Sequence, residues 1–423
     1  MLTVSSGIFL SRLLGLVRDI AFAVYWGTGT AFAAFWIAFT IPNLLRALFG
    51  EGAFTAAFVP VFSERLEREG REASWMAAER VITLLMIILS GIVIIAVLLS
   101  AVLAPFITDE LFRATLTLLP VVMPYGLLIC VTGAFAAVLN SLKRFSLPAY
   151  TPVLLNIVFI AATLVICPYW EASGHSPVFA LALAVPFAGL LQLAVHVIGC
   201  RREGLVFRFR AGFHSPEVRR IALLMGPALL GTGVVQLNIV VDRLLAGILG
   251  SAAVGALYYS QRLVYLPVGL FGVAMGIVCL PGMSRAWTRN DRAEMLSSLR
   301  YGLRYALFLG LPAAAFLAVL AVPLVRLLFE HGSFGVSSRN ETVWALFFYL
   351  PGIPAFIAAK IAVTPFYARQ DTKTPVKIAA FCLVLNVMLN VILMQFLRQG
   401  GLALATSICS YVNVGLLLYR LRS

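Results

Sequence analysis

Charged residues are scarce in this sequence. Only 12% of its 423 side chains are Asp, Glu, Lys or Arg, about half of the roughly 25% found in soluble domains. Apolar residues make up 61%, whereas a membrane-spanning helix needs about 20 mostly apolar residues. This composition excludes a soluble enzyme, a fibrous protein and a disordered chain. It indicates an all-α polytopic membrane protein.

Patterns of reactive residues are also missing. The six cysteines lie in apolar stretches without a CxxC pair, which favours buried free thiols over disulfides or a metal site. The four histidines form no HExxH pair, and we interpret them as structural. The net charge is +14, but Lys and Arg lie mostly in loops and form no single basic face. We therefore expect no nucleic-acid partner. The missing Cys and His patterns likewise predict no cofactor or metal bound by such residues.

The apolar runs predict about twelve transmembrane helices. They cover residues 3–26, 31–62, 77–103, 116–139, 150–167, 178–200, 221–249, 252–281, 301–322, 343–367, 378–396 and 402–421. The second run is long and is interrupted around Pro42 and around Gly50-Glu51-Gly52. Broken helices of this kind expose backbone amides that suit anion binding.

Basic residues are distributed unequally between the connections. Every second connection, counted from the one after the second span and including the C-terminus, belongs to a set that holds 21 Lys and Arg residues. The opposite connections hold four, which are Arg113, Arg326, Arg339 and Arg398. The positive-inside rule assigns the richer set to the cytoplasm. We therefore expect both termini to be cytoplasmic.

Seven basic residues fall inside the expected spans. They are Arg12, Arg18, Arg46, Arg243, Arg262, Arg304 and Lys360. Arg304 is expected to reach the cytoplasmic surface. Against the other six basic residues stand only three acidic residues at comparable positions in the spans, namely Asp19, Glu51 and Asp242.

This surplus of positive charge indicates a water-filled cavity for an anion, because a central Arg or Lys costs about 2.5 to 3.5 kcal/mol. Ion pairs that join helices are the alternative interpretation for any single residue. The planar guanidinium of arginine donates paired hydrogen bonds to phosphate oxygens. A phosphate or diphosphate is therefore the expected anion.

The chain also repeats itself. The stretches 27–60 and 250–281 carry a glycine, an interrupting proline and a closing proline in the same order, at offsets of 223 and 221 residues. Pro124 and Pro351 are 227 positions apart, as are Pro148 and Pro375. These offsets predict two pseudo-symmetric six-helix lobes of the same orientation, at residues 1–205 and 206–423.

Four segments make the sequence familiar. They are SRLLGLVRD (11–19), AFTIPNLLRALFGEGAFTAAFVPVF (38–62), YYSQRLVYLPVGLFGVAMG (258–276) and FYARQDTKTPVKIA (366–379). They closely resemble the MurJ/MviN lipid II flippases of the multidrug/oligosaccharidyl-lipid/polysaccharide exporter superfamily, and the resemblance runs from end to end. It implies two six-helix lobes around a central cavity. It also implies carriage of the undecaprenyl-diphosphate-linked peptidoglycan precursor from the inner to the outer leaflet. By motif match, the functional arginines of the family fall on Arg12, Arg18, Arg46 and Arg262.

Two departures from the family pattern limit this transfer. Where the family usually has an acidic residue before the AF of the second span, this chain has Ala33. Family members usually continue with two more helices, thought to line a groove for the lipid tail, and this sequence stops at Ser423. We therefore expect a shorter version or a truncated one.

A cation site is a further hypothesis. Asp242, Asn386, Asn390 and Thr406 offer oxygen ligands with a single carboxylate, a set that suits sodium better than a divalent ion. Hydrogen bonds between helices are the alternative role for Asn and Thr. Asp242 would then pair with Arg243 or Arg262.

The expected protein is a flippase, not an enzyme, and works by alternating access. Its predicted substrate site comprises Arg12, Arg18, Arg46 and Arg262 with Asp19 and Glu51. We expect a monomer in the bacterial inner membrane, with lipid II, membrane lipids and peptidoglycan synthesis enzymes as partners, and with sodium or the membrane potential as driving force. The alternatives are an exporter of another anionic lipid-linked oligosaccharide or small molecule, and a scaffold that binds lipid II without transporting it. A membrane phosphatase is disfavoured because no intramembrane His/Arg/Asp constellation is evident.

Overall fold

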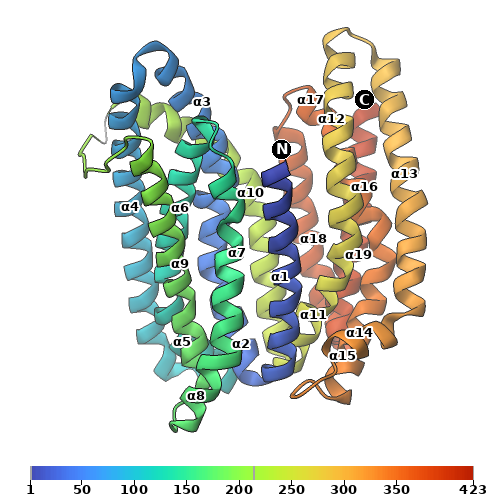
Figure 1. The fold of residues 1–423 in the computed structure, drawn as a ribbon. Helices are drawn as coiled ribbons and strands as arrows, with labels where there is room; N and C mark the ends of the chain where they lie inside the picture. The colour runs from blue at the N-terminus through green and yellow to red at the C-terminus, as the bar shows by residue number, and fades with distance from the viewer. Residues whose placement is uncertain (1, 213–214, 423) are drawn as a thin grey trace. The chain divides into compact units, whose positions relative to one another are not determined.

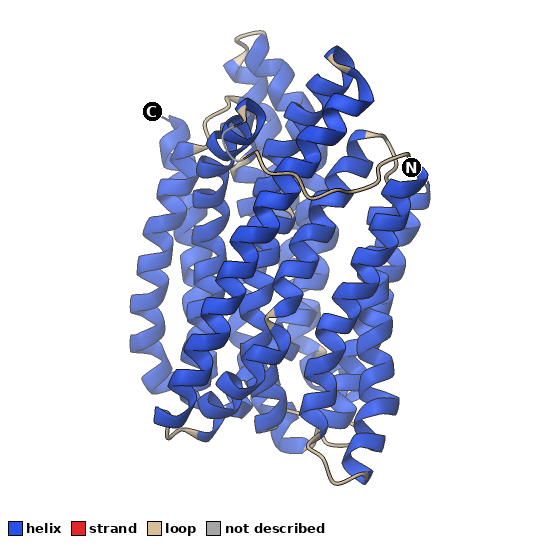
Figure 2. Ribbon diagram, turned by 90° about the vertical axis from the view of Figure 1, so that its left-hand side faces the viewer, coloured by secondary structure: helices blue, strands red, loops and turns tan. Residues whose placement is uncertain are grey.

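The computed structural model describes residues 2–212 and 215–422, and within these ranges every regular element is a helix (Figures 1 and 2). The chain forms two compact units. Unit 1 comprises residues 1–25 and 34–236, and unit 2 comprises residues 26–33 and 237–423. The predicted lobes, with their boundary at residue 205, are halves of the sequence repeat and stay a prediction.

Unit 1 holds the first nine helices of the chain, except the last residue of α1 and the first turn of α2, and it holds the larger part of the tenth. These are α1 (Leu2–Trp26), α2 (Thr30–Leu45), α3 (Gly52–Arg68), α4 (Gly70–Leu103), α5 (Glu110–Val122), α6 (Pro124–Ser141), α7 (Ser146–Ala161), α8 (Cys167–Ala172), α9 (Pro177–Arg202) and α10 (Pro216–Leu249). Short segments of other helix types join them, which are η1 (Arg46–Gly50) and η3 (Ala162–Ile166), both π-helical, and the 3₁₀ turn η2 (Ala104–Phe106). Within the unit, α6 packs against α3, α4 and α9.

Unit 2 holds the end of α10 and the remaining helices. These are α11 (Ser251–Pro267), α12 (Val273–Thr288), α13 (Arg292–Val319), α14 (Ala321–Phe329), α15 (Val336–Tyr349), α16 (Ile353–Ala362), α17 (Thr364–Ala368), α18 (Lys373–Leu397) and α19 (Gln399–Arg422). The π-helical segment η4 (Val268–Gly272) and the 3₁₀ turn η5 (Leu350–Gly352) interrupt them. Helix α19 packs against α15, α16 and α18.

Ten helices in the described residues are long and apolar enough to cross a membrane. They cover Thr30–Arg68, Gly70–Phe106, Pro124–Ser141, Ser146–Ala172, Pro177–Arg202, Pro216–Leu249, Arg292–Val319, Val336–Ala368, Lys373–Leu397 and Gln399–Leu421. The two other predicted spans, 3–26 and 252–281, are also helical. The first carries three charged residues, Arg12, Arg18 and Asp19, which lower its hydropathy.

Some predicted boundaries were wrong. The fourth span was expected from residue 116, but α5 ends at Val122 and α6 starts at Pro124, because proline favours the first turn of a new helix. The ninth was expected from residue 301, whereas α13 begins at Arg292. There the carboxylate of Asp291 caps the helix by accepting a hydrogen bond from the backbone N–H of Glu294 (2.8 Å), as N-cap aspartates do.

The sequence repeat has a counterpart in the backbone. Segment η1 follows Pro42 in the first half and segment η4 follows Pro267 in the second, and their first residues, Arg46 and Val268, are 222 positions apart. This spacing agrees with the repeat offsets in the sequence. Short π-helical turns inside α-helices often occur at functional sites.

Many of the exposed side chains on the helices are large and apolar. On α4, for example, Ile94, Ile95, Leu98 and Leu99 are all more than half exposed. Such a surface is unfavourable in water but matches lipid tails. The interior of unit 1 contains stacked and edge-to-face aromatic rings, among them Phe39 and Phe159, whose centroids are 5.8 Å apart.

Candidate functional site

A break in the second predicted span positions one arginine and one glutamate. Helix α2 continues through Pro42, changes to the π-helical segment η1 at Arg46, and stops at Glu51, whose backbone (φ −124°, ψ −113°) is not helical. Helix α3 then starts at Gly52. The thiol of Cys130 on α6 donates to the carbonyl of Leu45 (3.2 Å), so this carbonyl is hydrogen-bonded where the helix changes type.

A glycine allows α6 to approach the break closely. A Cβ atom added to Gly133 would lie 1.9 Å from the carbonyl oxygen of Gly50, far inside van der Waals contact. Any other residue at position 133 would therefore push η1 away and displace Arg46 with it. The close contact requires glycine because only glycine lacks a Cβ.

The guanidinium of Arg46 is held by two neighbours. Its Nη1 donates to Glu51 Oε1 (2.7 Å) and its Nε donates to Asn43 Oδ1 (2.9 Å). The side chains are 32% exposed for Arg46 and 60% exposed for Glu51. Because the carboxylate is so exposed, it can rotate away without leaving a charge buried.

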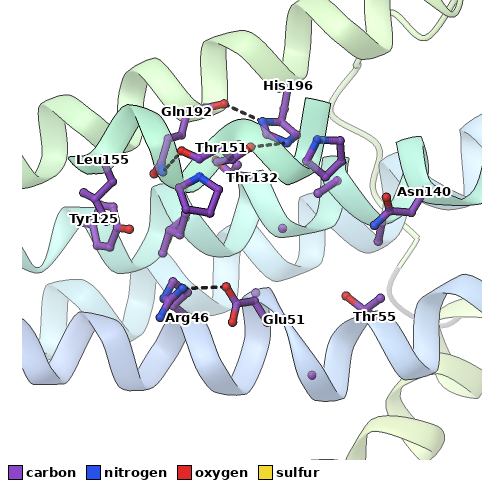
Figure 3. A pocket seen from close by; sticks show the side chains of 18 of the residues that line it. Arg46, Glu51, Thr55, Tyr125, Thr132, Asn140, Thr151, Leu155, Gln192 and His196 are labelled. Carbon is purple, nitrogen blue, oxygen red and sulfur yellow. Dashed lines mark hydrogen bonds and ion pairs between the residues drawn. The ribbon is translucent and has the colours of Figure 1, made fainter. Parts of the chain in front are cut away.

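Arg46 and Glu51 line a polar cavity inside unit 1. Its volume is about 570 Å³, within the ~300 to 1,000 Å³ typical of small-molecule sites. Figure 3 shows the two residues on one wall, with residues of α6, α7 and α9 on the others. Its remaining polar side chains are Thr55, Tyr125, Thr132, Asn140, Thr151, Gln192 and His196.

The wall formed by α7 and α9 contains a fixed polar network. Nδ1 of His196 lies 2.8 Å from the carbonyl of Gln192 and Nε2 lies 3.1 Å from the hydroxyl of Thr151. Since a carbonyl only accepts hydrogen bonds, Nδ1 carries a proton. The Gln192 amide donates to the carbonyl of Thr151 (2.9 Å), while its Oε1 has no hydrogen-bond partner among the residues that the structure describes.

Arg18 and Asp19 form a second arginine–carboxylate pair, on α1. Nε and Nη2 of Arg18 donate to Asp19 Oδ1 (3.0 and 2.7 Å), and Nη1 donates to Asn156 Oδ1 on α7 (3.0 Å). The two side chains are only 11% and 4% exposed. All three guanidinium nitrogens are therefore engaged in a buried network that ties α1 to α7.

The other two predicted arginines differ in their surroundings. Arg12 is exposed on α1. Arg262, in unit 2, is half-buried on α11, where its Nη2 donates to the hydroxyl of Tyr258 (3.3 Å) and its guanidinium lies over the ring of Tyr258, 4.7 Å from the centroid. A shared substrate site of all four arginines stays a prediction.

Three members of the predicted cation site are connected in unit 2. Nδ2 of Asn390 donates both to Asp242 Oδ1 (2.6 Å) and to Asn386 Oδ1 (2.9 Å). Oδ1 of Asn390 has no hydrogen-bond partner within the described ranges. The hydroxyl of Thr406 donates to the carbonyl of Leu402 in its own helix (3.0 Å).

The histidine pattern predicts only a structural role for His196, and no sequence motif points to Thr151 or Gln192 on the same α7 and α9 wall of the cavity. A signal was present, because Gln192 and His196 are four residues apart in the apolar span 178–200 and so lie on one helix face. Polar residues inside spans usually face the interior of a bundle.

A bundle of apolar helices with an internal repeat and an arginine-lined polar cavity defines the class of this protein, a multi-pass membrane transporter. A model of the lipid II flippase MurJ family matches residues 22–423. The chain therefore belongs to the MurJ family. A probable lipid II flippase MurJ from Rhizobium tropici is 36% identical over 420 residues, which span 97% of this chain and 78% of that protein. A lipid II flippase MurJ from Burkholderia cenocepacia is 36% identical over 432 residues, which span 100% and 83%.

Solved structures support the same assignment. A lipid II flippase MurJ in an inward closed conformation matches all of this chain and 88% of that one, with a TM-score of 0.84 and 27% identity. An inward-facing multidrug transporter of the MATE family matches with a TM-score of 0.79 at 14% identity, over 97% of this chain and 94% of that one. An outward-facing MATE transporter matches with a TM-score of 0.67 at 15% identity, over 100% and 95%. At these identities the MATE transporters share the fold.

Proposed function

We propose that this chain is a transporter that moves lipid II from the inner to the outer leaflet of the bacterial cytoplasmic membrane by alternating access. The observation that carries the proposal is the exposed Arg46–Glu51 pair on the wall of a polar cavity inside an apolar bundle. Membership of a family of lipid II flippases supports the substrate. The diphosphate of lipid II is the group that this arginine would bind.

Glu51 serves as an exchangeable counter-ion in this mechanism. In the structure its carboxylate accepts from Nη1 of Arg46, so the guanidinium has an anionic partner within the chain. A diphosphate offers more oxygen acceptors and can accept two parallel bonds from an arginine. When it enters, Glu51 rotates away, and when the substrate leaves, Glu51 returns. The carrier without substrate thus never holds an uncompensated charge. Such a charge would slow its return to the inward-facing state.

The direction of transport follows from the proposed orientation. The bias of 21 basic residues against four in the connections supports cytoplasmic termini. A reporter fused after Ser423 and one placed in the 65–80 connection should then both register inside, and one near Gly174 should register outside. The opposite pattern would contradict the orientation.

Vesicles test the function directly. The purified protein is reconstituted with lipid II in one leaflet, and the lipid II that reaches the other leaflet is measured over time. We expect exchange well above that of vesicles without protein. Binding without exchange would support a scaffold, and exchange of a different lipid-linked oligosaccharide in preference to lipid II would support the alternative exporter.

Sodium coupling at Asp242 is a separate proposal, with the membrane potential as the alternative driving force. Its support is the cluster of Asp242, Asn386 and Asn390, in which Oδ1 of Asn390, without a hydrogen-bond partner among the described residues, offers a ligand. To bind a cation, the Asn390 amide would rotate so that Oδ1 replaces Nδ2 beside the carboxylate, and Thr406 would add its hydroxyl. Asp242→Asn should weaken any sodium dependence of exchange. Sodium-independent exchange by the unaltered protein would reject this proposal alone.

The proposed partners follow from the same function. Membrane lipids surround the apolar helices, and peptidoglycan synthesis enzymes would receive the translocated precursor. We propose that the protein acts as a monomer, since one chain contains both sequence repeats. Light scattering of the detergent-solubilised protein tests the oligomeric state.

A further inference from the structure

We infer that the α7 and α9 wall of the unit 1 cavity is a binding subsite for the uncharged, hydrogen-bonding part of the substrate, its glycan. The inference rests on the proposed function and extends it from the diphosphate to the neighbouring sugar. Three residues form the subsite, which are Gln192, Thr151 and Thr132. All of them line the same cavity as Arg46.

The first observation is an acceptor without a donor. Gln192 is 2% exposed, and its Oε1 has no hydrogen-bond partner in the described part of the chain. A buried polar atom without a partner is unfavourable, so a ligand donor that reaches Oε1 through a small movement of the cavity lining would be favourable here. A phosphate at neutral pH offers acceptors, whereas a sugar hydroxyl or an amide N–H is a donor.

The second observation is the rigidity of this wall. The Gln192 amide is oriented by its bond to the Thr151 carbonyl, and the Thr151 hydroxyl is positioned by His196. His196 itself is fully buried and bonded through both ring nitrogens. The acceptor is therefore held in one orientation before any ligand arrives, which lowers the entropic cost of binding. His196 acts as a positioning residue.

The third observation is the size and composition of the cavity. About 570 Å³ is more space than two phosphate groups fill, and the polar lining away from Arg46 and Glu51 consists of hydroxyl and amide groups with one imidazole. Such neutral donors and acceptors suit a polyhydroxylated ligand. Arginine on one wall suits the diphosphate of a sugar diphosphate, and the amide and hydroxyl groups on the other wall suit its sugar.

The test compares two ligands, lipid II and undecaprenyl diphosphate, which lacks the glycan. The affinity of the full-length protein for each is measured per folded molecule, and the ratio of the two affinities is the readout. A purely structural role for Gln192 would lower the folded fraction but leave this ratio unchanged. In the unaltered protein we expect lipid II to bind more tightly.

Gln192→Met removes the amide at similar volume. We expect the preference for lipid II to fall about three- to tenfold, the range of one net hydrogen bond, with undecaprenyl diphosphate binding unchanged. Gln399→Met is the matched control, because Gln399 is also buried with an unpartnered Oε1 in the described chain but lies in unit 2. An unchanged ratio in Gln192→Met, or equal affinity of the unaltered protein for both ligands, would overturn the inference.

A labelling experiment decides the matter if Gln192→Met does not fold. Ala136 lines the cavity and the six native cysteines are buried, so Ala136→Cys introduces a single reactive thiol there. We expect lipid II to protect it from a maleimide and undecaprenyl diphosphate to protect it several-fold less, with Ser173→Cys as the unprotected control. Equal protection, or none, contradicts a glycan subsite.

Different results would contradict the proposed function rather than the glycan subsite. If neither ligand binds the unaltered protein, or if Arg46→Ala leaves undecaprenyl diphosphate binding intact, the diphosphate site itself is wrong. If undecaprenyl diphosphate binds through Arg46 but the glycan adds nothing, the proposed function stands and the glycan subsite does not.

Discussion

The Arg18–Asp19 and Arg46–Glu51 pairs place the same two charged groups in opposite environments. The first is buried, with side chains 11% and 4% exposed, and every guanidinium nitrogen of Arg18 is bonded. The second is open, at 32% and 60%, and borders a cavity. A buried ion pair is costly to break, whereas an exposed pair exchanges partners easily. We therefore propose a structural role for the first pair and a binding role for the second.

The largest effect is expected at Arg18. Arg18→Ala removes the guanidinium that faces Asp19 and leaves a buried carboxylate, which should destabilise the protein by about 3 to 5 kcal/mol. Thermal unfolding in detergent and the amount of folded protein in membranes measure this. The double variant Arg18→Met, Asp19→Leu should recover much of the loss, because a hydrophobic replacement leaves no buried charge. Normal stability of Arg18→Ala would contradict a structural role for the buried Arg18–Asp19 pair.

The second prediction concerns binding at Arg46. Arg46→Ala should lower the affinity for undecaprenyl diphosphate by about 1.5 to 3 kcal/mol, the range for bonds to charged groups, or roughly tenfold or more. Its folded amount should stay near normal, since the pair with Glu51 is exposed. Arg46→Lys keeps the charge but loses the planar fork, so binding should recover only in part. Full recovery with lysine would show that geometry is unimportant there.

The third prediction tests what holds Arg46 in place. Gly133→Ala puts a methyl group 1.9 Å from the Gly50 carbonyl, and overpacking of this kind costs about 1 to 3 kcal/mol. Lipid II affinity should fall as well, because η1 carries Arg46. Gly91→Ala in α4 is the control, since a Cβ there meets nothing within 4 Å, and it should not destabilise the protein. Equal behaviour of the two variants would mean that the break does not position Arg46.

The smallest effect is expected at Asp371, a carboxylate outside the membrane spans. Hydrogen bonds from the side chain and backbone of Thr374 lower the pKa of Asp371, and the backbone N–H lies 3.0 Å from Oδ1. A lowered folded-state pKa means that this contribution is present above the unfolded pKa of about 3.9 and is lost as the pH falls through the lower folded value.

Solvent screening keeps the size of this contribution at about 0.5 kcal/mol or less. Asp371→Asn should therefore be slightly less stable than the unaltered protein at pH 7, and the difference in melting temperature should shrink as the pH falls below about 3.9. A difference that stays constant across this pH range would point to a role other than charge.

Sequence alone determined the membrane class, the helical segments and the surplus of arginine inside them, because hydropathy is a sum over neighbouring residues and a helix satisfies its own backbone. It also indicated the family and the break that contains Glu51. It did not distinguish Arg18 from Arg46, since both appear as arginines in apolar runs near a carboxylate.

Only the tertiary structure decided which of the two is buried, because the contacts involved come from distant segments. Asn156, 138 residues beyond Arg18, completes the buried network, and α6, α7 and α9 close the cavity around Arg46. For the same reason the sequence did not predict the α7 and α9 wall of the cavity. Burial and hydrogen-bond partners depend on how helices pack. The sequence pattern shows which residues share a face of a helix, but not which other helix packs against that face.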